Sequence, residues 1–454
     1  MCIGLLRLTI VALLIGFGGP AAAWSNHALG TWPALSALPE VAAAGPLEVE
    51  SIEAFLAAEA PALVAVLASE EQWARAQVPA YPPRPDALAF AVPAGAAPAE
   101  LRRRFLAALR INPAARFALY LQVLPGRGVE GRPLLADTAI STLTRNETTR
   151  SNTFVALREG STVAALEVVA TASDEPDHGL DVGLWADSHT AAGAAYGFGP
   201  QPFGFNPAIE FASQGPFHVG FFHESPIVYK AAPFLLRTYA EYRIHLYRAL
   251  AAHALRSGHP YWGWRFTGWA LHYIQDLTQP YHASVLPGVG VPTMLWINTL
   301  DLIGLHGGKE RAVALVTNRH LALENYQFHR IRGAWLRKDT ADPAWQALAA
   351  TGGDAATAAY DEGSPRAVIT AQSRAAADAV DADLARHLPA KYTSDPSYVF
   401  GETEAGVDLE AVVRREPAEA RLAMDAALVR LLGNFGRHTR AFVRALVASS
   451  AAPR

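Results

Sequence analysis

Apolar residues recur three and four positions apart along most of the chain, the spacing that places them on one face of a helix. Residues 112–170 are compatible with loops, short strands or a further helix, and residues 170–225 resemble a loop. The expected fold class is therefore all-α, a multi-helix bundle with inserted irregular segments. The helices that the pattern predicts lie at about 47–77, 98–110, 228–256, 261–277, 309–330, 364–388 and 416–447.

One predicted helix carries polar side chains within an otherwise apolar sequence. The stretch GWALHYIQDLTQPYHAS, residues 268–284, contains His272 and Asp276, and His282 follows just beyond Pro280. Residues four apart lie on one face of a helix, so His272 and Asp276 point the same way. An imidazole with a carboxylate suits a borderline divalent ion such as zinc, although such a pair alone is more often a hydrogen-bonded pair in a core.

The same spacing occurs in RHLALE, where Glu324 follows His320 by four residues. Four further donors stand upstream: His27 in WSNH, Asp177 in DEPDHG, and His218 and His223 in PFHVGFFHES. Each is weak evidence by itself, because the chain has 15 histidines and free-standing histidines usually have structural roles. Their combination in this order is much more specific than any single donor.

The net charge of the chain limits the kinds of molecule it is expected to bind, and its N-terminal residues indicate where in or outside the cell it is expected to act. The formal net charge is −4 and no basic stripe is present, which argues against duplex nucleic acid as a partner. An apolar run from Leu8 to Phe17, followed by AAA, predicts a signal peptide at residues 1–23, cleaved after Ala23, and a secreted or periplasmic protein. Cleavage would leave Trp24 as the first residue, and a deprotonated α-amine with the carbonyl of the same residue can chelate a metal.

The order of these donors resembles that of the zinc-dependent phospholipase C and single-strand-specific nuclease superfamily. HYIQDLTQPYHAS is similar to a helix motif of that family, and EPDHG resembles the PD context of its clostridial alpha-toxin branch. The resemblance implies a helical bundle around a tri-zinc site, with Asp177 and Asp276 each bridging two Zn²⁺ ions. Asp174 and Asp181 are alternatives to Asp177, and His223 competes with His218. The metal ligands that the resemblance implies are Trp24, His27, Asp177, His218, His272, Asp276, His282, His320 and Glu324.

The same resemblance implies an exported phosphodiesterase that hydrolyses phospholipid head groups in the manner of phospholipase C. Metal-activated hydroxide would attack phosphorus, with Asp177 as the catalytic general base or as the group that orients the nucleophile. Glu324 is like the phospholipase branch, since the nuclease branch has Asp there. Two alternatives stay open: a single-strand nuclease or nucleotidase on the same zinc cluster, and a non-catalytic zinc-stabilised helical protein that binds lipid.

The resemblance covers a third to a half of the chain. It implies a phospholipase C/nuclease-like domain at 24–335 with an insertion at about 75–170, followed by a C-terminal helical extension at 336–454. These added segments affect the expected substrate class more than the expected metal binding.

Two apolar regions bear on the substrate. The segment 289–305 and the Phe-rich segment 198–222 could contact acyl chains or make transient contact with a membrane surface, but a buried helix packed on the core is the favoured interpretation. A nuclease would need an aromatic platform on which a base stacks. The candidates for that platform are Trp185, Tyr196, Phe203 and Phe205.

Overall fold

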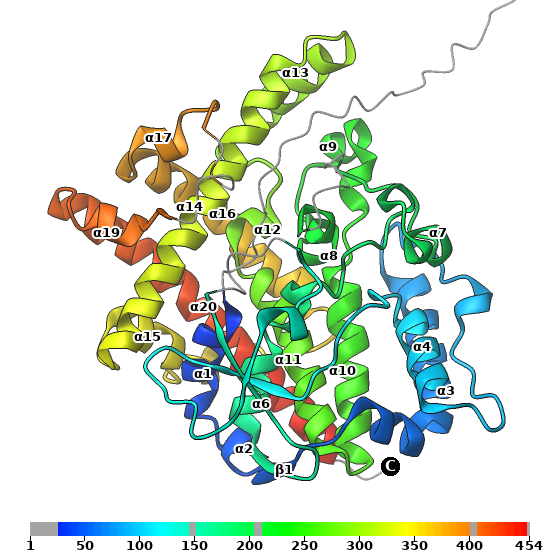
Figure 1. Cartoon of the computed structure of the whole chain (residues 1–454). Helices are drawn as coiled ribbons and strands as arrows, with labels where there is room; N and C mark the ends of the chain where they lie inside the picture. Colours follow the sequence, from blue (N-terminus) through cyan, green and yellow to red (C-terminus); the bar gives the residue numbers. More distant parts are fainter. Residues whose placement is uncertain (1–25, 145–150, 204–210, 399, 401–405, 452–454) are drawn as a thin grey trace, which may run out of the picture.

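Helices dominate the computed structural model, which describes residues 26–144, 151–203, 211–398, 400 and 406–451 (Figure 1). The expectation of a mostly helical protein is therefore confirmed. The helices in these residues are α1 His27–Ser36, α2 Pro39–Ala42, α3 Ile52–Gln77, α4 Pro98–Leu109, α6 Ala165–Ala172, α7 Ala191–Tyr196, α8 Gly215–His218, α9 Pro226–Ala231, α10 Ala240–Arg256, α11 Pro260–Asp276, α12 Pro280–Ala283, α13 Val291–Leu302, α14 Gly307–Arg337, α15 Pro343–Ala349, α16 Thr370–His387, α17 Ala390–Thr393, α19 Leu409–Val413 and α20 Ala418–Ala451.

Helix α11 lies at the centre of the molecule, where α6, α10 and α20 pack against it (Figure 1). Every residue from Tyr261 to Asp276 is buried, because this sequence is apolar on nearly all sides and other helices cover each side. Pro260 occupies the first turn, where its missing N–H costs no helical hydrogen bond. The helix ends at Asp276, and Pro280 starts the short α12, which carries His282.

Residues 112–170, which the pattern left open, form short strands and α6. These strands are β2 Tyr120–Val123, β3 Leu134–Leu135, β4 Thr153–Ala156 and β5 Thr162–Ala164, and one further strand, β1 Pro46–Glu48, precedes the region. Strand β1 pairs antiparallel with β5, and β2, β4 and β3 form an antiparallel sheet in that order. Side chains of this region reach the centre of the molecule: Gln122 of β2 is buried beside the start of α1.

The predicted helix at 228–256 is wrong in its first third. The chain instead forms α9, a 3-10 turn at Pro233–Leu236, and then α10 from Ala240. Pro233 explains the break, because proline has no N–H to donate and its ring clashes with the preceding turn of a helix. The remaining helices were predicted within several residues of their observed bounds, with α14 and α20 longer than expected.

The interpretation of 289–305 as a helix packed on the core is also wrong. The segment does form a helix, α13, but Met294 is its one buried residue. Trp296 is 62% exposed and Ile303, just after the helix, is 69% exposed. An apolar pattern predicts that a segment avoids water, but it does not identify what covers the segment.

Helix α20 belongs to the same core as the helices before it. It packs against α1, α10 and α11, and Phe442, Val443 and Leu446 lie in the apolar cluster that also contains Trp269. Residues of the predicted extension at 336–454 therefore help to support the helices that carry the candidate site.

Candidate metal centre

Eight of the nine donors that the sequence suggested lie together in the structure. They form three groups of three, and within each group the donor atoms lie within 4.8 Å of one another. His272 belongs to two of the groups. Trp24 lies outside the described residues. The groups are His27, Asp177 and His272; His218, His272 and Asp276; and His282, His320 and Glu324.

Asp276 links the three groups. Its Oδ2 lies 2.8 Å from Nδ1 of His218 and 3.3 Å from Nε2 of His272. Its Oδ1 lies 3.4 Å from Nε2 of His27 and 3.7 Å from Nδ1 of His282. The carboxylate is fully buried at the end of α11. One side chain therefore contacts imidazoles from α1, α8, α11 and α12.

The orientation of His27 is fixed by a second side chain of α11. Nδ1 of His27 lies 2.9 Å from Oε1 of Gln275, whose amide nitrogen donates to the hydroxyls of Thr31 and Thr439. Because the amide nitrogen of Gln275 already donates, the oxygen that faces His27 accepts a hydrogen bond from Nδ1–H of His27. Nε2 is then directed at Asp276 and could bind a metal ion on losing its proton, which is the arrangement of a metal-ligating histidine with a supporting partner.

His272 is oriented in the same manner. Its Nδ1 lies 2.7 Å from the backbone oxygen of Ser173, which follows α6, so Nδ1 is the donor. Its Nε2 then faces Nδ1 of His218 at 3.0 Å and Oδ1 of Asp177 at 3.7 Å. Nε2 of His27 on α1 and Nε2 of His272 on α11 thus both point toward the carboxylate of Asp276.

The third group pairs α12 with α14. Nε2 of His282 lies 3.1 Å from Nε2 of His320, and Nε2 of His320 lies 2.7 Å from Oε1 of Glu324. Gln279 donates its amide to the same Oε1 at 3.1 Å. The two facing imidazole nitrogens can share at most one proton, so at least one of them presents a lone pair.

Several donor atoms of these groups are buried without a hydrogen-bond partner. Such atoms are rare in folded proteins, and each costs the free energy of its lost hydration. Among the described residues, none of the three carboxylates forms an ion pair with Lys or Arg, although all three face imidazoles. A metal ion in each group would satisfy these atoms. The buried atoms are Nε2 of His27, Oδ1 of Asp177, Nε2 of His218, Oδ1 of Asp276, Nδ1 of His282 and Oε2 of Glu324.

Burial and neighbouring charges together move the pKa values of these groups away from their usual values. Burial acts to lower the pKa of His27, but the neighbouring carboxylates of Asp276, 3.4 Å away, and of Asp177 outweigh it and raise this pKa to about 9. Burial raises the pKa of Asp177 to about 7 against the charges of His218 and His27. Burial lowers the pKa of His282 to about 3. Close titratable groups in a region with no fixed cation behave in this way.

The alternative donors lie elsewhere or have other partners. His223 contacts the backbone oxygen of Arg366 and the hydroxyl of Thr370, both at 3.0 Å, and takes no part in the three groups. Asp181 is buried between the guanidinium of Arg243 and the hydroxyl of Tyr273, each 2.6 Å away. The geometry therefore favours His218 over His223, and Asp177 over Asp181.

Asp174 belongs to none of the three groups, but its carboxylate holds the start of α1, which carries His27. Its Oδ1 accepts from the backbone N–H of Ala28 at 3.2 Å, and its Oδ2 accepts from the amide of Gln122 at 2.7 Å. The amide nitrogen of Gln122 also lies 3.2 Å from Oδ1 of Asn26, the residue that caps α1. Sequence reasoning missed Gln122 and Gln275, because nothing in their local sequence marks a glutamine that holds a distant ligand.

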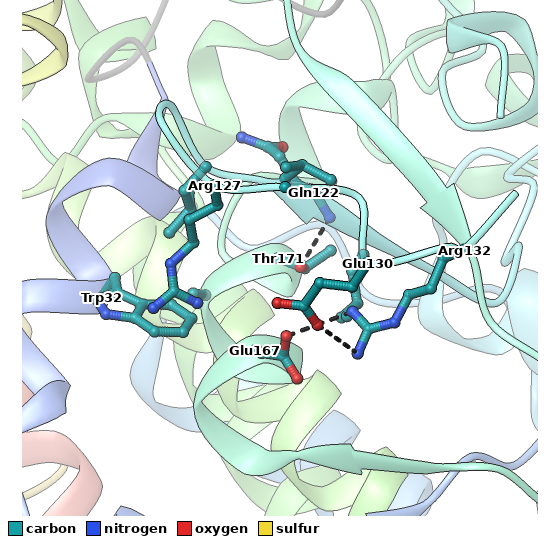
Figure 2. A pocket seen from close by; sticks show the side chains of 12 residues that line it. Trp32, Gln122, Arg127, Glu130, Arg132, Glu167 and Thr171 are labelled. Carbon is teal, nitrogen blue, oxygen red and sulfur yellow. Dashed lines mark hydrogen bonds and ion pairs between the residues drawn. The ribbon is translucent and has the colours of Figure 1, made fainter. Parts of the chain in front are cut away.

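A small pocket beside the centre carries charges that compensate one another (Figure 2). Arg132 lies 3.4 Å from Glu167 and 3.9 Å from Glu130, and the guanidinium of Arg127 lies 3.9 Å from the ring centre of Trp32. Gln122 lines this pocket, and its side chain amide also belongs to the network around Asp174. None of the eight grouped donors lines the pocket.

Two of the eight donors are partly open to solvent. The side chain of Asp177 is 16% exposed and that of His320 is 12% exposed, whereas the other six are at most 5% exposed. A solute would therefore reach the groups from the side of Asp177 and His320.

Comparison of the chain with protein-family models, curated proteins and solved structures gave no match.

Proposed function

We propose that this chain is a zinc-dependent phosphodiesterase of the phospholipase C type, active outside the cytoplasm after removal of residues 1–23. One observation carries the proposal: donors spread along the chain from His27 to Glu324 converge in three adjoining groups that Asp276 links. Adjacent metal ions suit phosphoester hydrolysis, because several cations can stabilise the charge on the attacking and leaving oxygens together.

The residues present fit zinc. The three groups contain five imidazoles and three carboxylates, a mixture of nitrogen and oxygen donors that a borderline ion prefers. Their unpaired buried atoms need cations, and the described residues supply no Lys or Arg to these carboxylates. We infer that Trp24, with its free amine and carbonyl, completes the group that contains His27.

Bound zinc would lower the pKa of a water molecule and act as a Lewis acid toward a phosphate oxygen. Asp177 is the carboxylate placed to accept a proton or to orient water, because it is the most exposed carboxylate of the set and its Oδ1 has no partner. Asp276 is fully buried and holds the imidazoles of His27, His218 and His272 in place. Three carboxylates carry fewer charges than three zinc ions, so the loaded site would attract an anionic phosphodiester.

The surroundings favour phospholipid over single-stranded nucleic acid. Trp185 and Tyr196 are buried, and the indole N–H of Trp185 donates to the backbone oxygen of Ser213 at 2.7 Å. Neither ring can stack on a nucleobase in this position. Phe203 packs against Phe221 and Phe234 in an apolar cluster, while Phe205 lies outside the described residues.

The test is elemental analysis of the mature protein, purified with its first residue sequenced, together with a substrate panel. We expect Trp24 as the first residue, about three zinc ions per chain, and hydrolysis of a chromogenic phosphocholine ester faster than release of nucleotides from single-stranded DNA. A metallated protein that hydrolyses no phosphoester would be the non-catalytic alternative, and faster release of nucleotides would establish the nuclease alternative.

His218 and His223 provide a matched pair of variants. Both are histidines of the same short segment, but only His218 contacts Asp276, at 2.8 Å, whereas His223 contacts Arg366 and Thr370. His218→Ala should lower the zinc content and the rate of ester hydrolysis together, and His223→Ala should preserve both. The reverse result would refute the proposed ligand set.

A further inference from the structure

An exposed apolar surface projects from the body near the candidate metal centre. It is formed by α9, the turn after it, and α13 with the residues that follow, which lie at the top of the view in Figure 1. We name it the apolar tip. Monomeric proteins rarely leave such side chains gathered at one end unless something binds there. The exposed side chains of the apolar tip are Ile227, Phe234, Trp296, Leu302, Ile303 and Leu305.

The apolar tip is built directly on segments that carry candidate ligands. Beneath it lies a buried cluster that includes Val219, the residue after His218, with Val285, three residues after His282, packed against it. The two segments are joined by the N–H of Gly220, which donates to the backbone oxygen of His282 at 2.8 Å. A partner that binds the apolar tip is therefore held close to the metal groups.

Charge is depleted across the apolar tip and positive at its rim. Residues 286–308 contain one carboxylate, Asp301, which is paired with His306 at 2.7 Å and with Lys309 at 2.8 Å. Lys230 on α9 and Arg311 on α14 are exposed, Glu310 next to Arg311 is half-buried, and together with Lys309 and Asp301 these side chains carry one net positive charge. An apolar centre with a cationic rim complements a lipid surface, whose acyl chains lie beneath a layer of phosphates.

We propose that the apolar tip docks into the interfacial layer of a phospholipid bilayer. Trp296 would sit at the level of the head groups, where an amphipathic ring is favoured, and Leu302, Ile303 and Leu305 would enter the acyl boundary. Lys230 and Arg311 would contact lipid phosphates. The choice of a phospholipid partner rests on the proposed function, but docking itself requires no turnover.

The test uses the full mature protein and vesicles of a phosphocholine lipid whose glycerol C–O–P bridge is replaced by C–C–P, which phospholipase C chemistry does not cleave. The protein should sediment with the vesicles, and an anionic lipid should increase binding in a salt-sensitive manner. A Trp296→Asn, Ile303→Asn double variant should lower the binding constant about tenfold or more, because two large apolar side chains no longer leave water.

Leu134→Asn and Leu422→Asn are matched controls, since these leucines are 68% and 67% exposed on other elements, β3 and α20. Both controls should bind like the wild type, and the double variant should hydrolyse a soluble phosphocholine ester at the wild-type rate. The docking proposal is overturned if the wild type does not sediment or if the double variant sediments equally well. It is also overturned if the wild type is a dimer that the double variant dissociates without any vesicle binding. Absence of ester hydrolysis with intact sedimentation would overturn the proposed function alone.

Discussion

Replacing Gly268 with alanine should push α11 away from α6. A Cβ at this position would lie 2.5 Å from Cβ of Ala172, 2.8 Å from the backbone oxygen of Val169 and 2.9 Å from the carbonyl carbon of Ala172. Ordinary contacts between such atoms are about 3.5–4.0 Å, so the two helices must separate by about 1 Å. The obstructing atoms belong to backbone or to a side chain with no rotamers, and they cannot move aside locally.

The size of the effect follows from two opposing terms. Overpacking of a core typically costs about 1–3 kcal/mol, and the rigid neighbours of Gly268 place this site near the upper end. Alanine in place of glycine inside a helix contributes about 1 kcal/mol in the opposite direction. Gly268→Ala should therefore lower the free energy of unfolding by about 2 kcal/mol. At Gly433, in α20, a Cβ would meet nothing within 4 Å, so Gly433→Ala should raise the free energy of unfolding by about 1 kcal/mol.

Urea unfolding of both variants and of the wild type, followed by circular dichroism in the presence of a chelator, measures these values without metal. A second measurement is metal content. His272 follows Gly268 by one turn of α11 and donates from Nδ1 to Ser173 at the end of α6, at 2.7 Å. Separation of the helices would disturb this contact, so Gly268→Ala should also bind less zinc. If Gly268→Ala proved as stable as Gly433→Ala, the close approach of α6 and α11 would be refuted.

Three other predictions concern single sites. Asp276→Asn should lower zinc affinity at least about a hundredfold and abolish ester hydrolysis, because this carboxylate contacts imidazoles of all three groups. A variant that binds zinc fully and hydrolyses the ester would contradict the role of Asp276 as a shared ligand. A protein with one extra residue before Trp24 should lose one zinc ion of three by elemental analysis, and full occupancy would exclude the amine as a ligand. Burial and the charge of Arg437 lower the pKa of His438 from 6.5 to about 4. A histidine whose pKa is lowered in the folded state contributes fully to the stability of the folded protein above pH 6.5, and this contribution is lost as the pH falls toward 4. In urea unfolding, the free energy of unfolding of the wild type should therefore fall by about 2 kcal/mol more than that of His438→Gln between pH 7 and pH 5. Equal losses in the two proteins would contradict the buried, neutral state of His438.

The part of the candidate site that could be predicted from sequence is the part that depends on local spacing. His272 and Asp276 share a helix face because they are four apart, and Pro280 separates His282 from that helix in a way that the sequence shows directly. His320 and Glu324 follow the same rule on α14. The resemblance added the order of the donors and so distinguished the five histidines that it assigns from the other ten in the chain.

Contacts between distant segments could not be predicted in this way. His27 meets Gln275 across 248 positions, and Gln122 meets Asp174 from a strand in a region whose secondary structure the sequence left open. Gln275 stands inside the motif HYIQDLTQPYHAS but its spacing from the ligands marks no role for it, and Gln122 stands in no distinctive motif. The exposure of α13 is a similar case, because periodicity reports that a helix forms but not whether another element covers it.

The metal binding that we propose would be coupled to folding through α11. The helix contributes His272, Gln275 and Asp276 to the candidate centre while its other residues pack among α6, α10 and α20, so the candidate ligands cannot move without the core. Without an ion, buried donor atoms such as Nε2 of His27 and Oδ1 of Asp276 lack partners, which destabilises the folded state. A ligand that binds only the folded state stabilises it in proportion to the logarithm of its concentration over its Kd. Zinc should therefore raise the unfolding midpoint with increasing concentration, and a midpoint independent of zinc would show that these side chains do not converge on an ion.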